Sequence, residues 1–352
     1  MSSSERDPKG GLLARLAEGP VICSEGYLFA LERQGYVQAG PFVPLAVLEH
    51  PEVVQQLHRD FVRAGSDVVE AFTYYAHREK LKLVDRTPDL ERLNRRALQI
   101  AREVARETGT MLAGDICHTN IYSNTDKSTQ SAACAMFEEQ VGWAVEEGAD
   151  FIIAETFSWA QEALIAVEVV KQVRLPVVAT LAVRREPVTR EGWTLADACK
   201  RLEDAGADVV GLNCYHGPAT MLPLLGNIRR AVKCHVAALP VPYRTTEQEP
   251  TFMSLRDPGC DCLPGEMPFP LALDPFYCHR FEIAKFAREV YALGVKYLGV
   301  CCGAMPHQIR SMAEALGRTP PGSACSPDMS THVFFGTAQS LNPDNLEYGK
   351  EL

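Results

Sequence analysis

The sequence of 352 residues predicts a single-domain (β/α)8 TIM barrel of the α/β class, on the evidence of three features. Eight short runs rich in Val, Ile and Leu recur along the chain, and segments with helical apolar spacing lie between them. Glycine often closes a helical segment before the next run. Strands that are nearly continuous in hydrophobicity and alternate with helices indicate a parallel sheet covered by helices. Eight such units over about 300 residues favour a closed barrel.

The expected strands cover residues 20–26, 66–73, 111–116, 149–156, 176–183, 207–214, 235–241 and 296–302. The expected helices include residues 46–64, 89–107, 131–147, 159–173, 194–205 and 280–293. Glycine ends several helices, as in "RAGSDVV", "EEGADFI" and "ALGVKYL", because the left-handed turn at a helix C-terminus costs glycine nothing.

A doubly wound sheet is the alternative architecture. That fold usually carries a glycine-rich phosphate loop after its first strand, and the chain has neither G-x-G-x-x-G nor a Walker motif. We therefore expect a disordered start over residues 1–10, a catalytic barrel over 11–316 and a C-terminal extension over 317–352. The extension is rich in Pro and Ser and has no clear helical pattern.

The charge and the start of the chain limit the classes of partner. The formal net charge of −10 is offset by no basic cluster, which argues against nucleic acid and anionic membrane surfaces. The opening "MSSSERDPKGG" lacks the apolar core of a signal peptide, and no apolar run approaches the roughly 18 residues of a membrane span. We expect a cytoplasmic protein, a homodimer, whose partners are small molecules.

Twelve cysteines are many for a chain without a secretory signal, where metal binding or catalysis explains cysteines better than a disulfide framework. Most of them are expected to pack as small buried hydrophobes. Cys214 ends the sixth expected strand, and Cys301 and Cys302 end the eighth. In a closed barrel these strand ends are one strand apart, so the three thiols can converge at the C-terminal face, where barrel active sites lie.

Three thiolates with an open fourth position are the ligand set of a catalytic zinc ion. Neighbouring residues on a strand face opposite sides, so Cys301 and Cys302 can share an ion only where the strand ends, and Gly303 allows that turn. Zinc suits soft ligands and deprotonates a bound thiol. The sequence therefore predicts one Zn²⁺ on Cys214, Cys301 and Cys302 that activates a thiol substrate as a nucleophile.

The stretches "GLNC" and "GVCCG" that hold these cysteines resemble the zinc signature of homocysteine S-methyltransferases, with the betaine–homocysteine branch closest. The resemblance covers roughly residues 11–316 and includes "FALERQGYVQAGP", "FTYYA" and "AREVYALGVKYLGVCCG". It implies an enzyme of methionine biosynthesis that moves a methyl group from a quaternary ammonium or sulfonium donor to the zinc-bound thiolate of homocysteine. The donor is left open between glycine betaine, a related betaine and a sulfonium such as dimethylsulfoniopropionate.

The resemblance also implies roles for single residues. Cys214, Cys301 and Cys302 match the zinc ligands, and Glu155 matches a glutamate that holds the amino group of homocysteine. The donor side takes four aromatic residues: Tyr75 at the metal and the donor, Phe42 in place of a tryptophan, and the neighbours Phe72 and Tyr74. An aromatic cage suits a methylated cation, which has no hydrogen bond to donate. Alternatively, Phe72 and one tyrosine only pack between the barrel and its helices.

Two departures from the family pattern lie on the acceptor side. Ser24 and Glu25 stand where the family has Asp-Gly after the first strand, and Glu70 and Ala71 stand where it usually has Gln-Thr. We expect Glu25 or Glu70 to join Glu155 and Asn213 in binding the acceptor's ammonium group. A different thiol acceptor or donor is the alternative.

Two rival functions remain in view. A barrel hydrolase would use Glu70, Asp115 and Glu155 as paired carboxylates, but that leaves the thiols unexplained. A non-catalytic zinc protein would add a fourth ligand, with His216 and His307 the candidates, although His216 is expected to face solvent in a loop. Cys260 and Cys262 in "GCDC" offer a second, weaker metal site. They lie in a long segment, 243–279, expected to cover the site as a lid.

Overall fold

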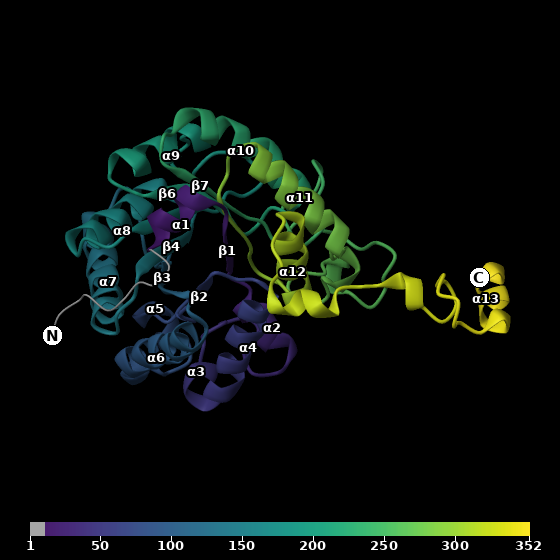
Figure 1. The fold of residues 1–352 in the computed structure, drawn as a ribbon. Helices are drawn as coiled ribbons and strands as arrows, with labels where there is room; N and C mark the ends of the chain where they lie inside the picture. The colour runs from purple at the N-terminus through teal and green to yellow at the C-terminus, as the bar shows by residue number, and fades with distance from the viewer. Residues whose placement is uncertain (1–10) are drawn as a thin grey trace.

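The computed structural model describes residues 11–352, so the predicted disorder of residues 1–10 lies outside the described residues. Eight parallel strands form a nearly closed barrel with helices between them (Figure 1), which confirms the predicted (β/α)8 class. Each expected strand overlaps one observed strand. The observed strands are β1 (Val21–Ser24), β2 (Val68–Glu70), β3 (Met111–Cys117), β4 (Phe151–Phe157), β5 (Val177–Leu181), β6 (Val209–Asn213), β7 (His235–Leu239) and β8 (Tyr297–Val300). Of these, β3 and β4 each end one residue beyond the expected range.

The strand order is β1-β8-β7-β6-β5-β4-β3-β2, so β8 lies beside β1 and one strand from β6, as predicted. At the remaining seam, the Asp67 N–H donates to the Ile22 carbonyl of β1 at 2.7 Å. The strands are buried almost throughout, as parallel strands between a packed interior and a ring of helices must be. The closed order places the ends of β6 and β8 near each other.

Helices cover the outside of the barrel, and the expected helices overlap observed ones. The α-helices are α1 (Leu12–Glu18), α2 (Tyr27–Arg33), α3 (Ala46–Glu49), α4 (Pro51–Ala64), α5 (Arg78–Lys82), α6 (Leu90–Thr108), α7 (Lys127–Glu146), α8 (Ala160–Gln172), α9 (Leu195–Asp204), α10 (Pro218–Ala231), α11 (Arg280–Ala292), α12 (Pro306–Ala315) and α13 (Pro343–Glu351). Short 3₁₀ helices cover Thr87–Asp89, Pro264–Glu266, Asp274–Phe276, Pro321–Cys325 and Met329–Thr331.

One expected helix is broken in two. The segment 46–64 forms α3 and α4, with His50 outside the helical region between them at φ −141° and ψ 55°. Pro51 causes the break, because a residue before proline avoids the helical region and proline suits the first position of a new helix. Among the described residues, none of the helices combines the length and apolar character that a membrane crossing requires.

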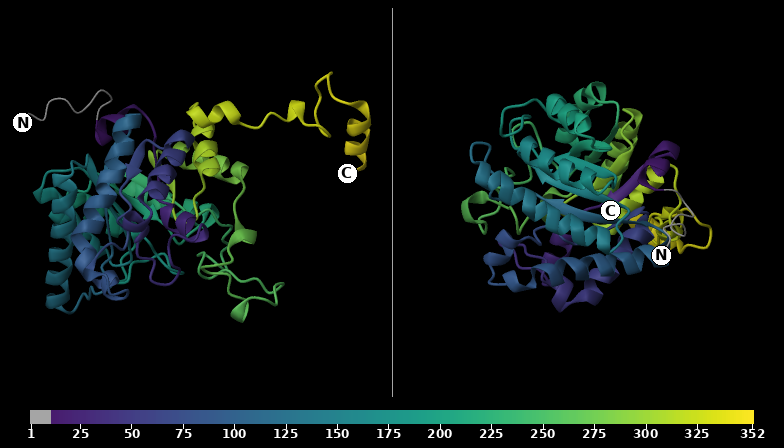
Figure 2. Two further views of the ribbon diagram at one scale, coloured as in Figure 1. Left: turned by 90° about the horizontal axis from the view of Figure 1, so that it is seen from below. Right: turned by 90° about the vertical axis from the view of Figure 1, so that its left-hand side faces the viewer.

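The C-terminal tail stays bound to the barrel through Ser323 and Ser326, whose hydroxyls donate to Glu314, and then leaves it as an extended arm (Figure 2). It ends in α13, so the expectation of no helix in the tail was wrong. Asn342 caps α13 by accepting a hydrogen bond from the Asp344 N–H, and Pro343 occupies the first turn. The apolar spacing of this segment is weak, and the capping signal was the only local sign of the helix.

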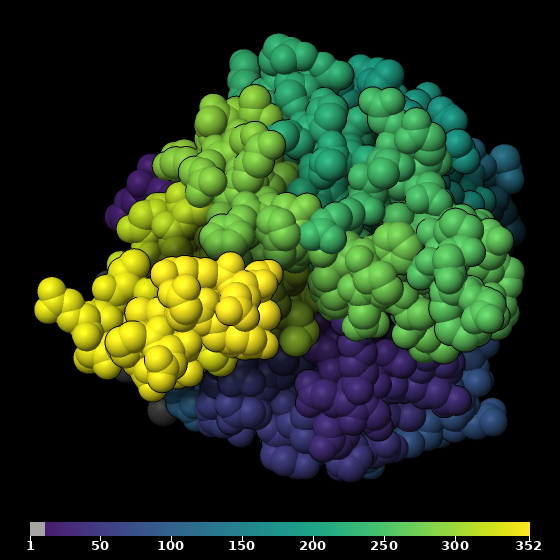
Figure 3. Space-filling model, turned by 90° about the vertical axis from the view of Figure 1, so that its right-hand side faces the viewer, coloured from purple at the N-terminus to yellow at the C-terminus, as the bar shows by residue number. Residues whose placement is uncertain are grey.

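The long segment after β7, residues 240–279, lies against the N-terminal part of the chain. Figure 3 shows the green surface of this segment meeting the purple surface of the N-terminal residues. Arg33 of α2 binds the Tyr277 hydroxyl and lies 3.6 Å from the Asp274 carboxylate. The ring of Phe252 packs 6.1 Å from that of Phe29. The segment is therefore tied to the barrel.

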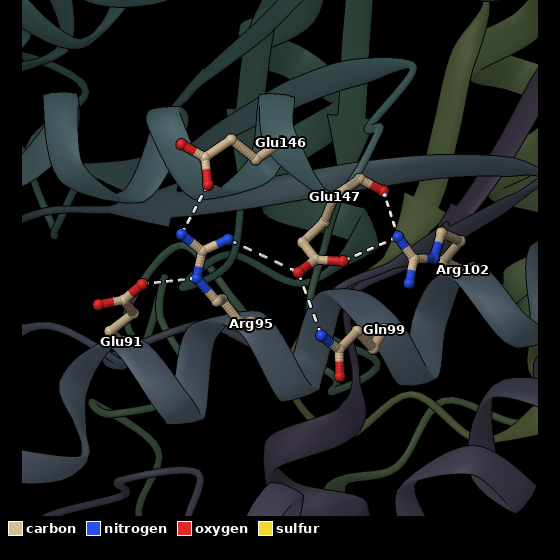
Figure 4. A network of polar contacts seen from close by, with 6 residues as sticks. All are labelled: Glu91, Arg95, Gln99, Arg102, Glu146 and Glu147. Atoms are coloured by element: carbon tan, nitrogen blue, oxygen red, sulfur yellow. Dashed lines mark hydrogen bonds and ion pairs between the residues drawn. The ribbon is translucent and has the colours of Figure 1, made fainter. Parts of the chain in front are cut away.

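A polar network joins α6 to the end of α7 (Figure 4). Its centre is Glu147, whose side chain is only 11% exposed and whose carboxylate lies 2.8 Å from the Arg102 guanidinium. Gln99 donates to the same carboxylate at 3.1 Å, and Arg95 lies 3.6 Å from it. Arg95 also pairs with the more exposed Glu91 and Glu146.

We predict that Glu147→Ala lowers the free energy of unfolding by about 1–2 kcal/mol, because it removes the carboxylate that three half-buried donor side chains share. Glu91→Ala is the matched control, and its exposed pair should contribute less than about 0.5 kcal/mol. Urea unfolding of the two variants measures the difference. Equal stability losses would show that the network does not depend on Glu147.

Candidate active site

Three thiols meet at the C-terminal face of the barrel. The sulfurs of Cys214, Cys301 and Cys302 lie within 4.8 Å of one another. Cys214 and Cys301 are 4% and 2% exposed, and Cys302 is half-buried. The structure thus brings together the three cysteines that the sequence singled out, from the ends of β6 and β8.

Hydrogen bonds among the sulfurs polarise the group. The Cys301 and Cys302 thiols donate to Cys214 and hold the pKa of its thiol well below the ordinary value. Burial holds the pKa of Cys301 well above its ordinary value, and the bond to Cys214 raises that of Cys302. In such a cluster one thiol can ionise readily, but ionisation of all three is unfavourable unless a cation compensates the negative charge.

Unusual backbone conformations produce this convergence. Cys214 and Tyr215 have left-handed backbones with φ 57° and 54°, and Gly303 has φ 94°. A Cβ at position 303 would lie 2.3 Å from the Tyr243 hydroxyl, so glycine is required there on two grounds. Non-glycine residues with positive φ store strain that clusters at functional sites. The turn expected at Gly303 is present.

No histidine joins the thiol group within residues 11–352. His216 is buried at 5% exposure, so the expectation that it faces solvent was wrong. Its Nε2 lies 3.1 Å and 2.9 Å from the Val183 and Arg184 carbonyl oxygens, and its Nδ1 lies 3.1 Å from the Thr220 hydroxyl. With both ring nitrogens engaged in structural contacts, His216 is not placed as a fourth ligand.

Four carboxylates at the ends of β1 to β4 lie beside the thiols. Glu25, Glu70, Asp115 and Glu155 are all at most 6% exposed. Burial raises the pKa of each one, that of Glu155 to about 8. Glu25, Glu155 and Cys301 offer ligand atoms within 4.8 Å of one another, so the carboxylates and thiols form one continuous site.

Asn213 connects the two parts of the site. Its side-chain amide donates to Glu25 Oε2 at 3.3 Å and to Glu155 Oε2, and its Oδ1 accepts from the Thr156 N–H at 3.0 Å. The Thr156 hydroxyl donates to Glu155 at 2.8 Å. Asn213 thereby orients two carboxylates from the residue next to Cys214. A cavity opens among these groups, and its walls include Glu25, Glu70, Phe72, Tyr74, Asp115, Glu155, Cys301 and Cys302.

The aromatic residues expected on the donor side do not form one cluster. Tyr74 and Tyr75 lie with ring centroids 4.3 Å apart, and Tyr75 has a left-handed backbone with φ 62°. Phe72 is buried, lines the cavity and packs 6.0 Å from Tyr27, which favours the packing alternative for its ring. Phe42, with φ 54°, packs instead against Phe29 at 5.8 Å.

Residues that the sequence did not single out surround Tyr75. Its hydroxyl lies 3.1 Å from His118 Nε2, and the Lys80 ammonium lies 3.7 Å from the centre of its ring. The Lys80 ammonium thus occupies one face of the Tyr75 ring in a cation–π contact. His118 directly follows the C-terminal end of β3, and this position is the sequence feature that could have identified it.

The segment 240–279 contacts both sides of the thiol group. The Phe252 N–H donates to the Tyr215 carbonyl at 2.8 Å, and the Tyr277 hydroxyl donates to the Gly303 carbonyl at 2.9 Å. These partners directly follow Cys214 and Cys302, which agrees with the expected lid. Cys260 and Cys262 form a disulfide in this segment, where the sequence suggested a metal site instead.

Comparison with known proteins identifies similar chains. A family model described as homocysteine S-methyltransferase matches residues 26–316. A protein of Xenopus tropicalis named betaine–homocysteine S-methyltransferase 1 is 39% identical over 330 residues, which cover 90% of this chain and 78% of that protein. A protein of Pongo abelii named S-methylmethionine–homocysteine S-methyltransferase BHMT2 is 35% identical over 341 residues, covering 95% of this chain and 88% of that protein.

Solved structures share the fold. The metallated form of the homocysteine methyltransferase MmuM from Escherichia coli superposes with a TM-score of 0.66 at 17% identity. The match covers 86% of this chain and 98% of that one. The oxidized form of MmuM matches with a TM-score of 0.64 at 16% identity, over 83% of this chain and 94% of that one.

Proposed function

The chain belongs to the homocysteine S-methyltransferase family, and on that premise we propose how its own residues hold a metal, the acceptor thiol and the methyl donor. It is an S-methyltransferase that methylates homocysteine to methionine. We propose that it depends on zinc and takes the methyl group from a betaine-like quaternary ammonium compound. The convergence of three thiols with a carboxylate-lined cavity is the observation that carries this proposal.

A metal cofactor fits the thiol group, and the donor set favours zinc. Three soft sulfur ligands suit zinc, and the buried cluster needs a cation to hold more than one thiolate. Cys214, Cys301 and Cys302 would bind the ion and leave one position for the acceptor. When bound, zinc keeps the sulfur of a thiol substrate deprotonated at neutral pH.

The acceptor's ammonium group is assigned to Glu25 and Glu155. Both carboxylates accept from Asn213, and both offer ligand atoms within 4.8 Å of the Cys301 sulfur. Asn213 directly precedes Cys214, a proposed metal ligand. The carboxylates that Asn213 orients can hold the ammonium group of homocysteine while the sulfur of homocysteine reaches the metal. Asn213 is a positioning residue in this arrangement.

The donor is assigned to the Tyr74 and Tyr75 rings, and the contribution of Phe42 stays a prediction, because its ring packs against Phe29. A methylated cation binds over aromatic faces, since it offers charge without hydrogen-bond donors. Relatives of this chain are named for both a betaine and S-methylmethionine, so ammonium and sulfonium donors are both tested. The cytoplasmic location and the homodimer predicted from the sequence stay predictions.

A donor comparison tests the function. The purified zinc-loaded protein is incubated with homocysteine and trideuteromethyl forms of glycine betaine, S-methylmethionine or dimethylsulfoniopropionate, and labelled methionine is measured by mass spectrometry. Glycine betaine is expected to give the highest kcat/KM. A higher value for either sulfonium donor would assign the site to sulfonium compounds, and no labelled methionine from any donor would contradict the donor assignment altogether.

We predict that Tyr75→Ala raises the donor KM by roughly 2–30-fold, because a cation over an aromatic face contributes about 0.5–2 kcal/mol. Tyr75→Phe keeps the ring and removes only the hydroxyl contacts with His118 and Tyr74, so it should retain most of the donor affinity. Tyr348→Ala, on the exposed face of α13, is the control. An unchanged donor KM in a folded Tyr75→Ala protein would remove the tyrosine from the donor site.

A further inference from the structure

A positive charge lies beside the aromatic rings that are assigned to the donor. The ammonium group of Lys80 lies 3.7 Å from the centre of the Tyr75 ring. Within residues 11–352, neither Tyr74 nor Tyr75 has any other lysine or arginine over its ring. Lys80 belongs to α5, and the fully buried side chain of Leu81 anchors this short helix. The lysine is therefore a fixed part of the donor side.

The Lys80 ammonium has no carboxylate partner in the part of the chain that the structure describes. Its hydrogen bond goes to the Pro41 carbonyl at 3.4 Å, which is longer than an ordinary N–H···O bond. Lys80 is half-buried, and burial lowers the pKa of its ammonium group. Lys82 of the same helix differs, because it is 56% exposed and pairs with Glu79 at 2.6 Å. A half-buried charge such as that of Lys80 is stabilised when an anion binds beside it.

The neighbouring histidines do not supply a second positive charge. Burial lowers the pKa of His77 to about 3 and that of His118 to about 4, and the nearby charge of Lys80 contributes to both shifts. Both imidazoles are therefore neutral at neutral pH. The Nε2 atom of His118 is also engaged with the Tyr75 hydroxyl at 3.1 Å. Lys80 is thus the charged member of this cluster, and the group that an anionic part of a substrate can use.

A betaine donor needs an anion site next to its cation site. Glycine betaine carries its carboxylate one methylene group away from the methylated nitrogen. When that nitrogen lies over the tyrosine rings, the carboxylate must lie close to them as well. Tyr74 lines the same cavity as Cys302, so this position is beside the proposed metal. The cavity is also lined by Glu25 and Glu155, and these carboxyl groups repel an anion whenever they are ionised. Lys80 offers the opposite charge on the donor side.

We propose that the Lys80 ammonium binds the carboxylate of the methyl donor and makes the site selective for zwitterionic donors. A donor with a carboxylate forms a charge-assisted hydrogen bond to Lys80 and neutralises the charge beside the Tyr75 ring. A donor that is only a cation meets a ring whose face already holds a positive charge, and the two like charges repel each other. The lysine thus favours methylated onium compounds that carry a carboxylate near the cationic centre.

This inference rests on the proposed function, because it assumes that the donor binds at Tyr74 and Tyr75. A matched pair of donors tests it in the full-length zinc-loaded protein with homocysteine. Dimethylsulfonioacetate and trimethylsulfonium differ only in the carboxyl group, and the wild type is expected to prefer the first. Lys80→Met keeps an unbranched apolar side chain. It should lower kcat/KM for dimethylsulfonioacetate at least about tenfold and leave that for trimethylsulfonium unchanged or higher. Lys80→Arg should retain the preference of the wild type.

Lys82→Met is the control, since it removes an exposed and paired ammonium group of the same helix and should leave both values at the wild-type level. Equal losses for the two donors in Lys80→Met would show a packing role, and unchanged values would show that Lys80 does not contact the donor. Either result overturns the inference. Lys80→Gln is the second variant if Lys80→Met fails to fold.

Binding without turnover separates this inference from the proposed function. Dissociation constants of glycine betaine and tetramethylammonium, measured by isothermal titration calorimetry, repeat the comparison between a zwitterion and a cation. A loss of affinity in Lys80→Met that is confined to glycine betaine supports the inference even if no donor yields methionine, a result that would contradict the proposed function alone. A wild-type protein that binds neither compound would contradict both.

Discussion

Replacing Cys301 by alanine is expected to remove the metal and to reduce methyl transfer to the background rate while the barrel still folds. Cys301 is 2% exposed and shares hydrogen bonds with Cys214 and Cys302, so its loss leaves two sulfurs for an ion that needs three. The same result is expected for Cys214→Ala and Cys302→Ala. Elemental analysis gives the metal content, and conversion of homocysteine to methionine gives the activity.

A matched control separates the metal from packing. Cys199 is a fully buried cysteine of α9 that belongs to no metal-ligating group in the described chain. Cys199→Ala removes the same atoms from a buried position, so it should lose a similar amount of stability and keep full metal and activity. Full zinc occupancy in a protein with both Cys301→Ala and Cys302→Ala would show that the three thiols do not form the zinc site.

The sequence was sufficient for the barrel and for the thiol group because both depend on local signals. Strands and helices follow from apolar periodicity, and once eight units close a barrel, the ends of β6 and β8 must lie close together. Gly303 marked the turn that lets two neighbouring cysteines reach one position. Each of these inferences needed only a short stretch of sequence and the rule that barrel sites form at strand ends.

The surroundings of the site could not be predicted in the same way, because they depend on long-range packing. Phe252 and Phe269 come from the segment after β7, yet their rings lie 6.1 Å and 6.5 Å from Phe29 near the N-terminus. No periodicity encodes that contact, and it moves Phe42 into a different aromatic group from Tyr75.

His216 shows a second limit. Its burial follows from left-handed backbones at Cys214 and Tyr215, which non-glycine residues rarely adopt and which no residue pattern announces. A chain that continued in the ordinary conformation would carry the His216 ring elsewhere. The strained turn that positions the first thiol thus also decides where the histidine points, and only the three-dimensional structure reveals both.

Changing Glu25 to glutamine is expected to raise the KM of homocysteine at least about tenfold and to leave the donor KM within about twofold. The substitution keeps the shape of the side chain and its acceptor for Asn213, and it removes the charge that the acceptor's ammonium group needs. Truncating one partner of a buried charge pair costs at least 2 kcal/mol in general, which is more than tenfold in affinity. Steady-state kinetics with each substrate varied in turn measure the two constants.

Glu162→Gln is the control for that substitution. Glu162 is also buried, at 2% exposure, and its carboxylate accepts a hydrogen bond from Thr119, but it does not line the cavity. It should leave both Michaelis constants unchanged. If Glu25→Gln and Glu70→Gln each leave homocysteine kinetics untouched, the ammonium assignment is wrong. A thiol without an amino group then becomes the acceptor to test. Buried carboxylates that bind no ammonium group would have to be neutral or bound to a metal ion, because an unpaired buried charge is costly.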